Sequence, residues 1–275
     1  MTLLAAIFLG VLGAAIGSFL SVVTFRVKKK KKGIFFGNSV CPHCKKPLKW
    51  RHLIPVFSFL FLRGRCGLCG KKISKHYFAM EILTAAIFVL TFLHWNFVTL
   101  TPSLIDPNFI LYGIDWNIFE KFTFYAIEMV LLMAIFFYDL LYKEIPDRFS
   151  LPAILLGILV AVLFGTPSLI SMGIGILIIA FFFGGQILIS RGAWLGGGDL
   201  RLGAILAVLL GWELMVLALI MSYVFGALVS IILLLSKKAD RKTAIPFGPF
   251  LITGGLIALF IGEEILTFYL STIGW

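Results

Sequence analysis

Two aspartates stand in apolar sequence, where a carboxylate is costly. Asp139 lies in the stretch "AIFFYDLLYKEIPD", and Asp199 follows three glycines in "AWLGGGDLRLGAIL". An ionisable side chain within a membrane segment needs a partner or water, so it is a candidate for function. Two carboxylates that meet at a partly dehydrated site cannot both ionise easily, so one keeps its proton. Such a pair is suited to peptide hydrolysis, because the charged acid activates water and the protonated acid stabilises the oxyanion.

A helix cap is the alternative interpretation of Asp199, because an acid after a glycine run often begins a helix, where the dipole favours its charge. A cap does not explain Asp139, which interrupts a helical segment. Asp147, which follows Pro146, is expected to cap the next helix, with a direct catalytic role as the alternative. Three glycines before Asp199 would let an extended substrate backbone approach it without a side-chain clash. They are Gly196, Gly197 and Gly198.

Two further acids occur in apolar sequence. Glu128 precedes Asp139 by eleven residues, which is close to three helical turns and about 16 Å along one face. That distance is too long for shared proton chemistry. We therefore expect a buried hydrogen-bonding role for Glu128, and likewise for Glu81, which lies at the start of an apolar segment.

Four cysteines form two C-x-x-C pairs in the polar stretch between the first two apolar segments. They are Cys41 and Cys44, then Cys66 and Cys69. The spacing is typical of a structural four-cysteine Zn²⁺ site, and a short insert without a large core gains from such a clamp. The alternatives are free thiols or two redox pairs. Three histidines in the same stretch are available as other ligands but are expected at the surface: His43, His52 and His76.

The elements that must position these residues are membrane helices. The chain has 275 residues, of which 60% are hydrophobic and 13% charged, and its mean hydropathy is +1.05. This composition excludes a soluble domain and predicts an all-α polytopic membrane protein with a small cytoplasmic zinc-binding insert. Apolar runs predict about eight helices, with the sixth short, near 2–27, 77–97, 121–142, 149–165, 168–190, 200–212, 213–236 and 249–271.

The basic residues predict the orientation, since cytoplasmic loops retain Lys and Arg. Fifteen of the 24 basic residues fall from Arg26 to Lys75, and only Lys121 lies on the opposite side. We therefore expect both termini outside the cytoplasm, with the first segment kept as an anchor. The net charge of +11 needs no nucleic acid, because the run from Lys28 to Lys32 would lie against anionic lipid headgroups of the bilayer.

These patterns divide the chain into three predicted regions. Residues 1–27 form the first transmembrane helix, residues 28–76 the cytoplasmic four-cysteine insert, and residues 77–275 a membrane-embedded aspartic peptidase domain. Asp139 and Asp199 then lie at the same membrane face and at comparable depth.

The chain resembles the type IV prepilin peptidases, a family of GxGD-type intramembrane aspartic proteases that serve type IV pili and type II secretion. The resemblance rests on "GSFLSVVTFRV", the paired C-x-x-C insert with "RGRCGLCGKKIS", "MEILTA", "YDLLYKEIPD", "GGGDLRLG" and "IPFGPFLITGG". It implies an enzyme of the bacterial inner membrane that cleaves the leader of prepilins and pseudopilins after a glycine, at the cytoplasmic face. Asp139 and Asp199 match the family's catalytic aspartates.

The resemblance also implies a second activity, in which many relatives N-methylate the new N-terminus with S-adenosylmethionine. That activity is associated with the cysteine-bearing region. Three positions depart from the family's usual pattern and bear more on methylation than on proteolysis: Ser21, the "HLIP" stretch and Phe78.

Prepilin leaders resemble basic tags before an apolar helix. We therefore expect Glu144 and Asp147, on the connection after Asp139, to receive the leader. The stretch "IPFGPF" breaks a helix near the same face and is expected to shape the substrate groove. The strongest rival function is an ion-coupled transporter, which also uses broken helices and buried acids. The position of the aspartates at the membrane face and the lack of a visible inverted repeat argue against it.

Overall fold

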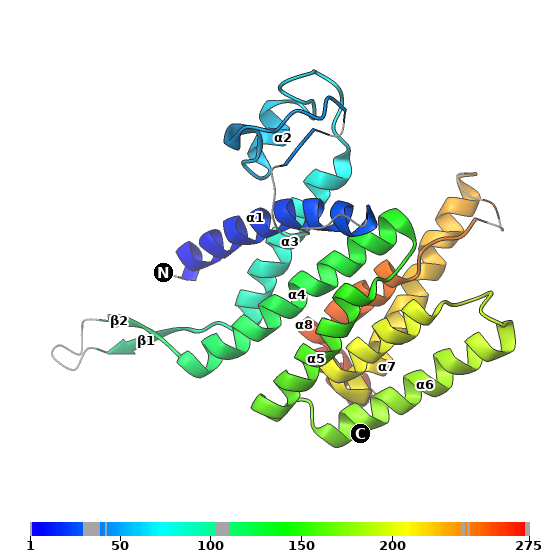
Figure 1. Ribbon diagram of the computed structural model, residues 1–275. Helices are drawn as coiled ribbons and strands as arrows, with labels where there is room; N and C mark the ends of the chain where they lie inside the picture. The colour runs from blue at the N-terminus through cyan, green and yellow to red at the C-terminus, as the bar shows by residue number, and fades with distance from the viewer. Residues whose placement is uncertain are drawn as a thin grey trace. The chain divides into compact units, whose positions relative to one another are not determined.

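Seven long helices dominate the computed structural model, which describes residues 2–29, 39–41, 43–102, 110–237, 240 and 243–272 (Figure 1). Each is long and apolar enough to cross a membrane, which confirms the prediction of a polytopic all-α protein. They are α1 (Thr2–Lys28), α3 (Lys75–His94), α4 (Trp116–Tyr142), α5 (Asp147–Phe164), α6 (Leu169–Ser190), α7 (Gly197–Leu235) and α8 (Gly248–Thr272).

Four short elements complete the described fold. The insert between α1 and α3 contains η1 (Trp50–His52) and α2 (Phe57–Phe61), and most of the basic run, Lys30 to Lys32, lies outside the described residues. Between α3 and α4, β1 (Val98–Pro102) and β2 (Ile110–Ile114) form an antiparallel hairpin in which Val98 pairs with Ile114. The apolar runs of the sequence did not predict these strands. The β-branched residues in "VTLTP" and "ILYGI" favour the extended conformation.

The chain forms two compact units, residues 1–133 and residues 134–275, and the division falls within α4. The first unit contains the four cysteines and the second contains both aspartates. The proposed division at residues 76 and 77 into an insert and one peptidase domain stays a prediction.

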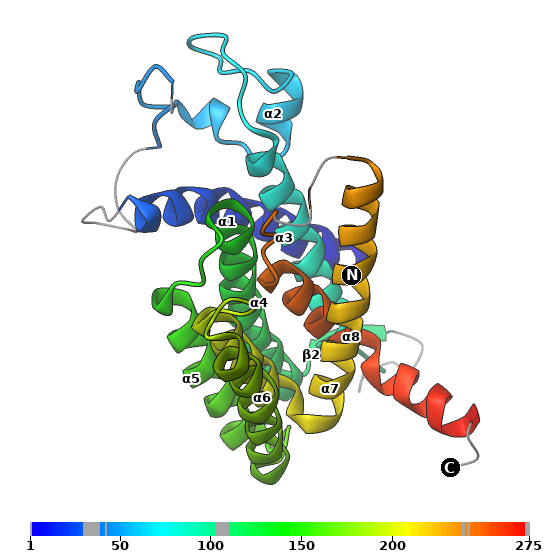
Figure 2. The same cartoon turned by 90° about the vertical axis from the view of Figure 1, so that its right-hand side faces the viewer.

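In the first unit, α1 packs closely against α3 (Figure 2). A Cβ added at Gly17 would lie 2.6 Å from the carbonyl oxygen of Met80. Glycine at this position therefore lets the two backbones approach, as is common where helices associate in membranes.

In the second unit, α7 consists of two arms that meet at Gly211. This residue has φ 74° and ψ 179°, a conformation that glycine adopts at no steric cost. The Oγ of Ser171 accepts a hydrogen bond from the N–H of Trp212 (3.1 Å) and ties the turn to α6. The predicted segments 200–212 and 213–236 correspond to these two arms.

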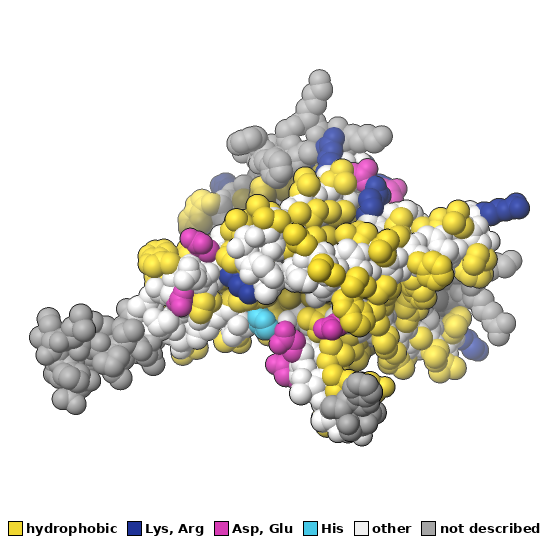
Figure 3. Space-filling model, turned by 90° about the horizontal axis from the view of Figure 1, so that it is seen from below, with side chains coloured by type: hydrophobic (Ala, Val, Ile, Leu, Met, Phe, Trp, Pro, Cys, Tyr) yellow, Lys and Arg dark blue, Asp and Glu magenta, His cyan; other side chains and the backbone are white. Residues whose placement is uncertain are grey.

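The described surface is rich in apolar side chains. Figure 3 shows yellow side chains over most of the face it presents, with few basic groups. Phe181 of α6 is 86% exposed and Leu235 of α7 is 80% exposed. Contiguous apolar surface of this kind marks contact with lipid or another apolar partner, which agrees with helices that span a bilayer.

Candidate active site and metal centre

Asp139 lies in the last turn of α4 and is buried, with 5% of its surface exposed. Its Oδ2 accepts a hydrogen bond from the backbone N–H of Gly248 (3.0 Å). Gly248 is the first residue of α8, so the carboxylate faces the N-terminus of that helix. The free N–H groups and the dipole of a helix N-terminus favour a negative charge.

Asp199 lies in the first turn of α7, three residues after the N-cap Gly196. Its Oδ2 accepts a hydrogen bond from the N–H of Gly196 (3.1 Å). Asp199 is therefore not the N-cap itself, although it makes the reciprocal contact of a capping box from the third helical position. The capping interpretation is thus partly confirmed, and the capping contact uses only one carboxylate oxygen of Asp199, Oδ2.

The second unit brings Asp139 and Asp199 together across sixty residues of sequence. The two carboxylates are close enough for a negative charge on one to disfavour a negative charge on the other. Each also faces a helix N-terminus, which favours its charge. Opposing influences of this kind produce a pair that holds one proton between two acids, and such a pair can act as acid and base in one reaction.

Gly248 is the site residue whose role sequence reasoning missed. We expected "IPFGPF" to break a helix and shape a groove, but Gly248 also donates a hydrogen bond to Asp139. A Cβ at this position would lie 2.6 Å from the Asp139 Oδ2, so a larger residue would displace the carboxylate. The glycine between two prolines was the available signal, but its partner is 109 residues away.

The connection from α4 to α5 borders the aspartates. Asp147 is the first residue of α5, and Pro146 occupies the N-cap without a side-chain cap, so the predicted capping role of Asp147 is wrong. Its carboxylate instead pairs with the guanidinium of Arg201 in α7. Glu144 is exposed on the same connection.

The three glycines before Asp199 have different surroundings. A Cβ at Gly198 would lie 3.0 Å from the Cβ of Ile145, whereas one at Gly197 would meet open space. Gly198 therefore permits close packing of α7 against the α4–α5 connection, and Gly197 leaves room beside Asp199. A Cβ at Gly196 would lie 3.8 Å from Asp199 Oδ2, which is ordinary contact.

Glu81 and Glu128, both in the first unit, differ from each other. Glu81 is buried, and its Oε2 accepts a hydrogen bond from the N–H of Val56 (2.7 Å), which confirms its predicted role. Val56 has a φ of 63°, rare for a β-branched residue. Glu128 is 1% exposed, and neither carboxyl oxygen has a hydrogen-bond partner among the described residues. Its burial is confirmed, but the predicted hydrogen bonding is not observed there.

The four cysteines converge in the first unit. All four Sγ atoms lie within 4.8 Å of one another, and the Sγ atoms of Cys41 and Cys69 are 4.0 Å apart. A tetrahedral Zn²⁺ with Zn–S bonds of about 2.3 Å requires sulfur atoms about 3.8 Å apart. The cluster therefore fits a four-thiolate zinc site.

Two similar turns produce this convergence. The N–H of Cys41 donates to the Lys46 carbonyl, and the N–H of Cys66 donates to the Lys71 carbonyl. The residue after the second cysteine of each pair has a positive φ, 57° at Lys45 and 69° at Gly70. Glycine adopts this conformation at no steric cost, and a lysine adopts the equivalent conformation in the first pair.

The histidines do not join the thiol cluster. The Nε2 of His43 lies 3.2 Å from the carbonyl oxygen of Lys72, and the ring of His52 packs over Gly67. His76 is exposed in the first turn of α3. The four cysteines are therefore the ligand set that the geometry supports.

The electrostatics of the cluster also favour a cation. Burial opposes ionisation of Cys41, but N–H groups of Cys44 and His43 and neighbouring thiols outweigh it, so the pKa of Cys41 is lowered. For Cys69, the Lys71 N–H favours the thiolate, but burial and the other three thiols together raise its pKa. The neighbouring thiols thus oppose a negative charge on Cys69. A divalent metal would relieve this repulsion.

Two known family models match parts of this chain. Residues 11–95 match the family model of the bacterial peptidase A24 N-terminal domain, and residues 126–231 match that of the type IV leader peptidase family. No solved structure matches the chain.

Three curated relatives are each named prepilin leader peptidase/N-methyltransferase. The Aeromonas salmonicida protein is 33% identical over 86% of this chain and 75% of its own length. The Legionella pneumophila protein is 28% identical over 95% and 93%, and the Bacillus subtilis protein is 28% identical over 95% and 96%. With a relative of this identity and coverage, and with the thiol cluster and the paired aspartates in the two matched regions, the chain belongs to the type IV leader peptidase family.

Proposed function

We propose that this chain cleaves the leader of type IV prepilins and pseudopilins after a glycine, at the cytoplasmic face of the bacterial inner membrane. Asp139 and Asp199 are the proposed catalytic pair. The observation that carries the proposal is that a buried acid, Asp139, and a half-buried acid, Asp199, sixty residues apart in sequence, meet at the N-termini of two helices. The names of the curated relatives supply the substrate class.

In the proposed reaction, the charged aspartate takes a proton from a water molecule, which attacks the carbonyl carbon of the scissile peptide bond. The protonated aspartate donates a hydrogen bond to the developing oxyanion. The tetrahedral intermediate then collapses, the C–N bond breaks, and the leaving nitrogen receives a proton from the pair. Gly248 positions Asp139 for this reaction, and the open space at Gly197 admits the substrate backbone.

A second reaction is proposed for the new N-terminus, which becomes N-methylated. S-adenosylmethionine is the substrate that donates the methyl group. We assign this step to the cysteine-bearing first unit, and its support is the matched N-terminal family model and the name N-methyltransferase carried by the relatives. The zinc site has a structural role, since four thiolates leave no open coordination position.

The test of the proteolytic proposal is cleavage of a purified prepilin in detergent, followed by mass. Asp139→Asn and Asp199→Asn should each lower kcat by at least about a thousandfold, because each removes an acid that must change its protonation state. Glu120→Gln, an exposed acid in the first half of α4, serves as the control. Cleavage at the wild-type rate by both folded Asn variants would refute the proposed pair and direct attention to Glu144 and Asp147.

A further inference from the structure

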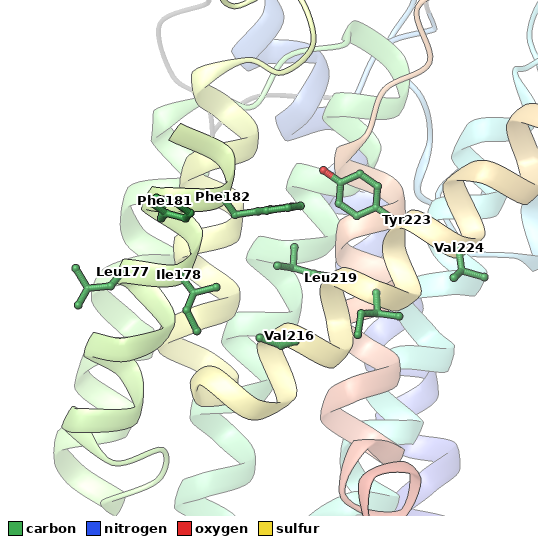
Figure 4. Close-up of a pocket in the computed structure, with 9 residues that line it drawn as sticks. Leu177, Ile178, Phe181, Phe182, Val216, Leu219, Tyr223 and Val224 are labelled. Carbon is green, nitrogen blue, oxygen red and sulfur yellow. The ribbon is translucent and has the colours of Figure 1, made fainter. Parts of the chain in front are cut away.

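A groove runs between α6 and the second arm of α7 and has a volume of about 730 Å³. Figure 4 shows Leu177, Phe181 and Phe182 of α6 on one side and Val216 and Leu219 of α7 on the other. Aliphatic and phenyl side chains form nearly all of its wall. An apolar occupant could therefore exchange its contacts with water or lipid for contacts with this wall at little cost in free energy.

One end of the groove is polar. The Tyr223 side chain belongs to the lining, and its hydroxyl lies 3.3 Å from the Nε2 of Gln186 in α6. Asp199 lies twelve residues before Gly211 and Tyr223 twelve residues after it. The Trp212 N–H bond to Ser171 and the Gln186 contact with Tyr223 show that the second arm runs beside α6 from the turn at Gly211 to the polar end. The charge of Asp199 also reaches the Tyr223 hydroxyl.

Side-chain contacts connect this end of the groove to the other aspartate. The rings of Tyr223 and Phe247 have centroids 5.0 Å apart. Phe247 immediately precedes Gly248, whose N–H binds Asp139. The polar end of the groove therefore adjoins both members of the carboxylate pair, and the apolar wall extends away from them along α6 and α7.

We propose that this groove binds the apolar helix that follows the cleavage site of the prepilin, an inference that rests on the proposed function. A prepilin chain has a peptide bond to be cut and then an apolar helix. The site has the same order. The carboxylates come first, then the Tyr223 and Gln186 side chains, and then the wall without polar groups at Val216 and Leu177. Phe181 and Ile220 are then specificity-determining contacts. Lipid chains alone would not require this alignment with the aspartates.

Photo-crosslinking tests the occupant directly. In the Asp139→Asn enzyme, Phe181 is replaced with benzoylphenylalanine, which keeps the ring, and the purified enzyme is irradiated with prepilin in vesicles of phosphatidylethanolamine and phosphatidylglycerol. We expect an adduct that mass spectrometry maps to the apolar helix of the prepilin. Phe268 of α8, 72% exposed against 86% for Phe181 and outside the groove, receives the same replacement as the control. Only lipid adducts at Phe181, or equal prepilin adducts at both positions, would overturn the proposal.

A filling substitution gives a second readout. Ile220→Trp should lower kcat/KM for prepilin by about tenfold, mainly through KM, because the larger ring occupies the groove. Ile231→Trp is the matched control, since Ile231 lies on the same helix outside the groove and is 53% exposed against 54% for Ile220. Equal kinetics for the two folded variants would remove the groove assignment. Cleavage by the Asp139→Asn enzyme would instead refute the catalytic pair, so the two failures are distinguishable.

Discussion

The two units place chemically active residues by different means. In the first unit, two C-x-x-C turns with the same backbone hydrogen bonds present four thiols that lie within 4.8 Å of one another. In the second, single acids from α4 and α7 meet beside the start of α8, and each depends on a backbone N–H for its position. A local turn can be recognised by its spacing, whereas a pair made by helix packing depends on residues far apart in sequence.

The thiol cluster and the aspartate pair also differ in what offsets their negative charge. Four buried or half-buried thiols within 4.8 Å of one another fit a metal ion, whose charge would offset that of the thiolates. The aspartates sit at helix N-termini, where backbone N–H groups and dipoles partly offset their charge. The first arrangement is therefore suited to a metal ion, whereas the second is held by helix packing.

Removal of the four thiols should have the largest effect. We expect the enzyme with all four cysteines replaced by Ser to lose bound zinc and N-methylation entirely, because the insert loses its clamp, while prepilin cleavage continues. Metal analysis and the mass of the cleaved product measure the two results. The control His43→Ala should keep its zinc, since His43 contacts the Lys72 carbonyl. Loss of cleavage in the folded Ser variant would contradict the independence of the two sites.

A methyl group at Gly248 tests the dependence on packing. Gly248→Ala should lower kcat for prepilin by about a hundredfold, since displacement of a catalytic group by about 1 Å has this effect. Gly173→Ala, where a Cβ would meet open space in α6, should leave kcat unchanged. If both variants cleave at the wild-type rate, the hydrogen bond from Gly248 does not position Asp139.

Glu81 and Glu128 of the first unit extend the comparison to stability. Glu81→Gln should lower the free energy of unfolding by about 1–3 kcal/mol, because it weakens a buried bond to the N–H of Val56. Glu128→Gln should change it by less than about 1 kcal/mol, since Glu128 has no hydrogen-bond partner among the described residues. Thermal unfolding in detergent measures both. A larger loss at Glu128 would show that its carboxyl has a partner after all.

The smallest expected effect concerns the acids beside the aspartates. Glu144→Lys and Asp147→Lys should each raise KM for a prepilin with a basic leader by about two- to fivefold, the range of exposed ion pairs. The effect should be smaller at Asp147, whose charge is already paired with Arg201. Glu120→Lys at the other end of α4 is the charge-matched control. Unchanged KM in both variants would remove these acids from leader recognition.

Much of the fold followed from hydropathy and spacing. The apolar runs located the spanning helices, the C-x-x-C pairs located the thiol cluster, and acids in apolar sequence singled out Asp139 and Asp199. The hairpin of β1 and β2 was not predicted, because β-branched residues favour an extended chain without indicating which segment it will pair with. The capping role predicted for Asp147 failed because α5 begins at Asp147 itself and Pro146 occupies the N-cap, and its partner Arg201 is 54 positions away.

The sequence by itself determined which segments enter the membrane and which residues are chemically costly there, because burial of apolar surface and the cost of buried charge depend on residue type and local pattern. Only the tertiary structure decided that Gly248 holds Asp139, that Ser171 of α6 bonds the turn of α7, and that an apolar groove lies between α6 and α7. These features arise from contacts between helices, and a local sequence pattern carries no information on which distant residue will be the partner.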